Sequence, residues 1–271
     1  MDASEAGRFD ASGEVGVGQA PYPTAVPGRT FATTLRALEG VAGWMTDAQA
    51  RRLWDAACGL APGARVVEIG SFQGRSTIVL ASAAADGVEV VAIDPHAGND
   101  RGPQEFSGYE AEAEGDHAAF VANLSAAGVA DRVRHLRMFS TEALGEVDGA
   151  VELLYIDGAH RYRPALDDVR RWGDRVADGG TLLIHDSFSS VGVTLAILRA
   201  LLVDRRFRYE GRSGSLASYR RVPAASRRAN AFRQLAELPW FARNVVIKAL
   251  LLARLRPLTR LLGHRTGDWP Y

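Results

Sequence analysis

Two aspartates and a histidine stand directly after short apolar runs, and their types suit metal binding or proton transfer. The run 151–157 ends at Asp157, with His160 three positions later, and the run 180–186 ends at Asp186. Carboxylate oxygens are the ligands that Mg²⁺ prefers, and an imidazole accepts protons near neutral pH. We therefore predict that Asp157 and Asp186 hold a divalent cation and that His160 and Asp157 are catalytic residues.

Other interpretations of the same residues stay open. Either aspartate could instead cap a loop or a helix, and His185 is expected to pack or hydrogen-bond locally. Two carboxylates with a histidine also suit iron, so an oxidoreductase or hydroxylase is an alternative function. A cofactor-binding module without catalysis is another. His96 is a second-choice base, and the pair 167–168 (Asp-Asp) is expected on a solvated helix face.

A glycine-bearing turn lies earlier in the chain, where residues 68–77 read EIGSFQGRST. Gly70 lets a ligand approach bare backbone, and Gly74 opens a helix whose first N–H groups face a ligand. The turn lacks the three-glycine spacing that seats a pyrophosphate, while Asp94 ends the next apolar run and suits ribose hydroxyls. These features, with Glu68 at the strand end, predict a nucleoside without phosphates, and we infer S-adenosylmethionine.

Short apolar runs alternate with helical segments around these residues, which predicts a doubly wound, mostly parallel α/β sheet of the Rossmann-like class. A closing hairpin adds an antiparallel strand at one edge. The carboxyl ends of parallel strands meet at one edge, so the candidate residues should converge there. Strands are expected at 65–70, 88–94, 133–139, 151–157, 180–186, 207–210 and 216–220, and helices at 48–58, 74–85, 116–128, 164–176 and 191–203.

The amino-acid composition excludes several classes of protein. Of 271 residues 47% are hydrophobic and 24% charged, which excludes wholesale disorder, and the single cysteine, Cys58, excludes an internal disulfide. The net charge is zero and no aromatic–basic interleaving occurs, so no nucleic-acid partner is expected. The first residues are acidic and lack an apolar segment, which favours a cytoplasmic protein over a secreted one.

Three regions follow from composition and charge. Residues 1–30 are expected to be disordered, 31–222 to form the catalytic domain, and 223–271 to form a basic, apolar, helical tail. The part from Arg220 onward holds eleven basic and two acidic residues. This tail either docks on anionic lipid at the inner face of the membrane, or packs on the domain or a second copy. The long connection 96–115 is expected to be a substrate lid.

Four segments, in their order along the chain, together resemble class I S-adenosylmethionine-dependent methyltransferases. They are 68–77, 93–95 (IDP), 155–162 (YIDGAHRY) and 179–187 (GGTLLIHDS). Over residues 40–222 the pattern is most similar to methyltransferase domain family 24, and to catechol and natural-product sugar O-methyltransferases. The resemblance implies a seven-stranded sheet with a reversed last hairpin. It also implies methylation of a small-molecule hydroxyl, including that of a sugar or glycolipid.

The resemblance assigns residues to the cofactor. It implies that Gly70 and Ser71 line the methionine part, with Ser76 near its carboxylate. Asp94 would hold the ribose, and Ser140 would line the adenine.

The resemblance also assigns the metal and the base. Asp157 and Asp186 match two metal ligands, while Ser187 stands where those enzymes have an asparagine as the third. A hydroxyl is a weaker ligand than an amide oxygen. His160 falls at the position of their catalytic lysine, and its lower intrinsic pKa suits a base at neutral pH.

Overall fold

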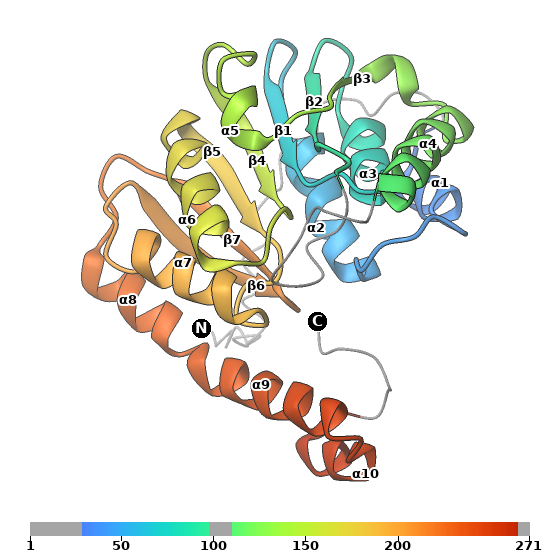
Figure 1. The fold of residues 1–271 in the computed structure, drawn as a ribbon. Helices are drawn as coiled ribbons and strands as arrows, with labels where there is room; N and C mark the ends of the chain where they lie inside the picture. Colours follow the sequence, from blue (N-terminus) through green and yellow to red (C-terminus); the bar gives the residue numbers. More distant parts are fainter. Residues whose placement is uncertain (1–28, 98–109, 265–271) are drawn as a thin grey trace, which may run out of the picture.

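The computed structural model describes residues 29–97 and 110–264, and their centre is a seven-stranded sheet (Figure 1). The strand order β3-β2-β1-β4-β5-β7-β6 confirms the predicted doubly wound α/β class. Of the segment 1–30 that we expect to be disordered, residues 1–28 lie outside the described part. The strands are β1 (Arg65–Ile69), β2 (Glu89–Ile93), β3 (Val133–Leu136), β4 (Val151–Ile156), β5 (Val176–Ile184), β6 (Phe207–Ser213) and β7 (Leu216–Arg221).

The closing hairpin adds an antiparallel strand near one edge of the sheet, as predicted, but this strand is not the edge strand itself. Strands β1 to β5 pair in parallel, and β7 pairs antiparallel with both β5 and β6. The reversed strand therefore lies one place in from the edge, and β6 forms the edge itself. Since β7 is covered on both faces, its residues Leu216 to Tyr219 are buried.

Helices cover both faces of the sheet, as the apolar strands require. One side of the sheet carries α1 (Phe31–Ala37), α2 (Asp47–Cys58), α3 (Arg75–Ala83) and α4 (Glu110–Ala126) (Figure 1). The other side carries α5 (Ser140–Ala143), α6 (Tyr162–Arg171) and α7 (Val191–Leu201). Single 3₁₀ turns, Ala130–Arg132 (η1) and Gly173–Arg175 (η2), precede β3 and β5. The short helices α1 and α5 were not expected, because four to seven residues carry too little periodicity to be recognised.

The tail packs on the domain through its first half. Helices α8 (Arg227–Leu235) and α9 (Leu238–Leu252) run below α7 and β6 in Figure 1, followed by α10 (Arg256–Thr259) and η3 (Arg260–Leu262). Trp240 and Phe241 pack against the core cluster beneath α6 and α7. Within the described ranges, no helix combines the length and apolar character needed to cross a bilayer.

Polar contacts from α8 and α9 reinforce this docking. The Asn230 side chain accepts from the Tyr209 amide at 2.7 Å, and Gln234 accepts from the Tyr219 hydroxyl at 3.1 Å. The Arg212 guanidinium lies 3.7 Å from the centre of the Trp240 ring. These buried bonds extend the domain into the tail, whose outer surface still exposes large apolar side chains such as Leu261.

Gly70 brings two strand ends into contact. Its φ of +87° is left-handed, and a Cβ added there would lie 2.3 Å from the Asp157 carbonyl oxygen. Its amide donates to the Ile93 carbonyl at 2.9 Å, and the Asp157 amide donates to the Ile69 carbonyl at 2.8 Å. The turns after β1 and β4 can approach this closely only because residue 70 has no side chain.

We expect Gly70→Ala to lower the free energy of unfolding far more than Gly63→Ala. Gly63 has nearly the same φ, +88°, but nothing lies within 4 Å of an added Cβ, so its variant reports backbone strain alone. We expect a loss of about 1 kcal/mol for Gly63→Ala and at least about 3 kcal/mol for Gly70→Ala, measured by urea denaturation. Equal losses would show that the Gly70–Asp157 contact is not a steric constraint.

Candidate functional site

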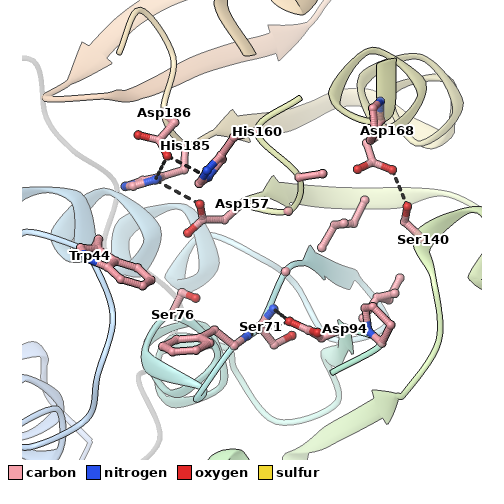
Figure 2. A pocket seen from close by; sticks show the side chains of 18 of the residues that line it. Trp44, Ser71, Ser76, Asp94, Ser140, Asp157, His160, Asp168, His185 and Asp186 are labelled. Carbon is pink, nitrogen blue, oxygen red and sulfur yellow. Dashed lines mark hydrogen bonds and ion pairs between the residues drawn. The ribbon is translucent and has the colours of Figure 1, made fainter. Parts of the chain in front are cut away.

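A cavity of about 930 Å³ opens at the carboxyl ends of the parallel strands. Its wall is formed by the turns after β1, β2, β4 and β5, by the segment before α2, and by one residue of α9. Figure 2 shows a histidine–aspartate group on one side, Ser71 and Asp94 below it, and Ser140 beside Asp168 on the other side. The predicted convergence of strand-end residues is therefore present.

Asp94 holds the glycine-bearing turn. Its Oδ2 accepts the amides of Ser71 at 2.9 Å and Phe72 at 2.8 Å, and its Oδ1 accepts the His96 amide at 2.7 Å. The Asp94 side chain is 16% exposed and lines the cavity. A carboxylate oxygen accepts two hydrogen bonds, so Oδ1 retains capacity for one ligand hydroxyl.

Glu68 lies behind the cavity wall rather than in it. Strand alternation turns its side chain toward α3, where it is fully buried and accepts hydrogen bonds from the hydroxyls of Ser76 and Thr77. Burial raises the pKa of Glu68 to about 7. Ser76 itself lines the cavity, so Glu68 orients a cavity residue without lining the cavity.

Gly74 also lies outside the cavity lining. It begins α3 with a φ of +87°, and an added Cβ would lie 2.5 Å from Leu124 Cδ1 of α4. This glycine permits α3 and α4 to pack closely. The predicted cofactor residues that do line the cavity are Gly70, Ser71, Ser76, Asp94 and Ser140.

Four polar side chains from two strand ends meet at one side of the cavity (Figure 2). His160 Nε2 lies 2.9 Å from Asp186 Oδ2, and His185 Nδ1 lies 3.1 Å from Asp157 Oδ1. The Tyr155 hydroxyl donates to Asp157 Oδ2 at 2.8 Å. Ligand atoms of Asp157, His160 and Asp186 lie within 4.8 Å of one another, which is close enough to share a metal ion.

The pairing of the two histidines with the two aspartates sets the charges of these side chains. Burial opposes the charged form of Asp186, but hydrogen bonds from His160 and His185 hold its pKa well below the usual range. Burial likewise disfavours a charged imidazole, yet Asp186 raises the pKa of His160 above its ordinary value. Asp157 and Asp186 raise the pKa of the fully buried His185 to about 10. Asp186 is thus an anion held by two imidazoles.

Ser187 is the predicted metal ligand that the structure contradicts. Its side chain is fully buried, and its hydroxyl donates to the Ile184 carbonyl at 2.8 Å. The adjacent residues Asp186 and Phe188 both have positive φ values, 53° and 55°, and this turn directs Ser187 into the core. The ligand atoms that do lie within 4.8 Å of one another belong to Asp157, His160 and Asp186.

Asp168 is a further correction, because we expected it on a solvated face. Its side chain is 5% exposed and accepts a hydrogen bond from the Ser140 hydroxyl. Burial raises the pKa of Asp168 to about 6. Ser140 also accepts from Trp172 Nε1 through its carbonyl at 3.1 Å, so α5 and α6 fix it at the cavity wall.

His96 lines the cavity next to Asp94 but is 4% exposed. Its ring packs against those of His117, His135 and Phe120, and burial lowers its pKa. The connection 96–115, predicted to be a lid, lies outside the described residues between 98 and 109.

Trp44 and Lys248 line the cavity but were not predicted from the sequence. Trp44, before α2, stacks on Phe72 with ring centroids 5.5 Å apart. Lys248 reaches the cavity from α9, and the only local signal for it is that it is the single lysine of the chain. Positive φ values at Phe72, His96 and Asp186 accompany the site, as strained backbone commonly does.

We expect Asp186→Asn to lower the pKa of His160 in metal-free protein. The change removes the charge that raises this pKa and leaves the burial that lowers it. Histidine NMR titration measures the shift, and His135, whose pKa burial lowers to about 4 at a distant position, is the internal control. An unchanged or higher His160 pKa would contradict the assigned electrostatics.

Comparisons with known proteins agree with this geometry. The profile of the family described as "Methyltransferase domain" matches residues 67–187, which span the glycine-bearing turn, Asp94 and both strand-end aspartates. A protein of Sinorhizobium fredii, "Uncharacterized protein y4gI", is 31% identical over 127 residues, which cover 45% of this chain. That match spans 13% of the length of the curated relative.

Solved structures share the fold. Cofactor-bound Rv0187 from MTB is 20% identical with a TM-score of 0.51, covering 72% of this chain and 89% of that one. An O-methyltransferase from Bacillus cereus in complex with SAH is 17% identical with a TM-score of 0.50, covering 70% and 90%. A protein from Corynebacterium glutamicum is 16% identical with a TM-score of 0.54, covering 73% and 94%.

The family match and the strand order lead to one conclusion. Residues 67–187 match the methyltransferase-domain family, and the seven-stranded sheet has the Rossmann-like fold of the solved methyltransferase structures.

Proposed function

We propose that this chain transfers the methyl group of S-adenosylmethionine to a hydroxyl oxygen of a small molecule. One observation carries the proposal: a single cavity joins the Gly70 turn and Asp94 to the group of Asp157, His160 and Asp186. The Bacillus cereus structure with this fold is an O-methyltransferase in complex with SAH, which supports this choice of cofactor and reaction.

The residues fit the cofactor. A volume of about 930 Å³ accommodates a nucleoside-sized ligand together with an acceptor. Asp94 Oδ1 would accept a ribose hydroxyl, while Ser71, Ser76 and the first amides of α3 suit the amino-acid part. Ser140, held by Asp168 and Trp172, would border the adenine. When bound, S-adenosylmethionine supplies an electrophilic methyl group.

His160 would remove the proton from the acceptor. Its side chain is 46% exposed, whereas that of His185 is 3% exposed, so His160 is the accessible imidazole of the pair. Asp186 orients the ring through Nε2 and stabilises the imidazolium that forms. Because Asp186 raises the pKa of His160, a larger fraction of neutral imidazole is available at mildly alkaline than at acidic pH.

The same three residues also fit a divalent cation. Two carboxylates and one imidazole, with ligand atoms within 4.8 Å, form a plausible donor set. When bound, such a cation lowers the pKa of a coordinated hydroxyl. His160 Nε2 is the atom that faces Asp186, so metal binding through this atom would be an alternative to its hydrogen bond with Asp186.

We expect Asp94→Asn to weaken binding of S-adenosylhomocysteine about tenfold or more, because an amide replaces the acceptor that fixes the turn and the ribose. Calorimetry measures the affinity. Asp116→Asn is the matched control, since Asp116 lines the cavity but accepts from the side-chain amide of Gln73 at 2.8 Å instead of from backbone amides of the turn. No binding by the unaltered chain would overturn the proposed function.

We expect His160→Ala to lower turnover by about 10²–10⁴-fold with unchanged S-adenosylhomocysteine affinity, as loss of a general base does. Transfer of a labelled methyl group to a panel of phenols and sugars measures the rate. Assays with EDTA and with added Mg²⁺ decide the role of the cation: loss with EDTA and recovery with Mg²⁺ indicate metal assistance. Normal turnover of the variant would contradict the assignment of His160.

A further inference from the structure

Helix α9 is joined to the site by side chains one helical turn apart. Asn244 Nδ2 donates to the Phe188 carbonyl at 3.4 Å, and Lys248 Nζ donates to the Ser189 carbonyl at 2.9 Å. Both carbonyls belong to the turn that follows Asp186. Asn244 and Ile247 are fully buried, so the face of α9 that carries Lys248 is anchored on the domain.

Lys248 differs from Asn244 because it also lines the cavity. It is the single lysine among 32 basic residues, and an ammonium is a compact point charge. Burial lowers the pKa of Lys248, while nearby Asp186 acts in the opposite direction. A partly desolvated cation at a cavity wall gives a strong interaction with an anion that enters the cavity.

Carboxylates and a second cation line the cavity together with Lys248. The carboxylates of Asp157 and Asp186 are already engaged by His185 and His160. Arg161 is a second permanent cation that lines the cavity, next in sequence to His160. A ligand that places a hydroxyl at His160 therefore meets cationic side chains beside it.

We propose that Lys248 is a specificity-determining residue that binds a carboxylate or phosphate group of the acceptor, so that anionic acceptors are selected over neutral ones. This inference deepens the proposed function and rests on it, because it takes the space beside His160 as the acceptor end. The tail is then part of the site, because α9 supplies the cation that binds the anionic group of the acceptor.

A structural role alone would make different predictions. If Lys248 served only to hold the turn after Asp186, then Asn244, which bonds the neighbouring carbonyl from the same helix face, would matter in the same way. Asn244 does not line the cavity among the described residues. Asn244→Ala is therefore the matched control for loss of the turn contact without loss of the charge.

The single lysine allows a direct observation. Reductive ¹³C-methylation keeps its charge and gives one side-chain NMR signal besides the α-amino group. With S-adenosylhomocysteine bound, the probes are two pairs: catechol with 3,4-dihydroxybenzoate, and glucose with glucuronate. We expect a carboxylate member to shift the Lys248 signal and its neutral partner to leave it unchanged. No shift with either carboxylate, or equal shifts within a pair, would overturn the inference.

Affinity measurements on variants give the second arm. We expect Lys248→Gln, which keeps a donor for Ser189, to weaken binding of the responsive carboxylate at least tenfold. Lys248→Arg and Asn244→Ala should stay within threefold. A loss in Asn244→Ala as large as that in Lys248→Gln would leave Lys248 a structural residue and refute the proposal. Normal S-adenosylhomocysteine binding in every variant separates this failure from failure of the proposed function.

Discussion

The contact between the Gly70 turn and the Asp157 carbonyl sets the geometry on which the rest of the site depends. It joins the ends of the neighbouring strands β1 and β4 in the middle of the sheet, so the glycine-bearing turn and the first strand-end carboxylate are adjacent without any bridging side chain. Asp94 then ties the end of β2 to the same turn through backbone amides. A ligand seated on the turn is consequently placed next to Asp157, and the proposed methyl transfer needs this proximity because the reacting atoms must be held close and in line.

Beyond that contact, the charged side chains of Asp157, His160, His185 and Asp186 compensate one another in pairs. Asp186 is kept anionic by two histidines, and the raised pKa of His160 is the consequence of the same pairing. Breaking one partner leaves the other charge without compensation in a poorly solvated place, which costs more than an exposed ion pair would. The left-handed backbone at Asp186 belongs to this arrangement, since it aims the carboxylate at His160 and turns Ser187 away into the core.

The position of the tail on the domain bears on its role. Its excess of basic residues and its apolar helix left two alternatives, a lipid surface or packing on the domain or a second copy, and the structure has α8 and α9 bonded to β6, β7 and the turn after β5. Exposed apolar side chains occur along the whole tail, among them Phe232 in α8 and Leu252 and Leu261 farther along. Lys248 of the tail therefore lines the cavity together with the strand ends of the domain, where the acceptor is proposed to bind.

The sequence by itself determined the strand ends, the glycine-bearing turn and the aspartates that follow β2, β4 and β5, because these depend on local periodicity and on the rule that parallel strands end together. It could not determine where a side chain points once a turn leaves regular structure, so Ser187 was expected at the cavity and Asp168 in solvent. Nor could it place Lys248, more than sixty residues beyond Asp186 along the chain. Only the docking of α9 brings them together, since helix packing depends on complementary surfaces that no local pattern encodes.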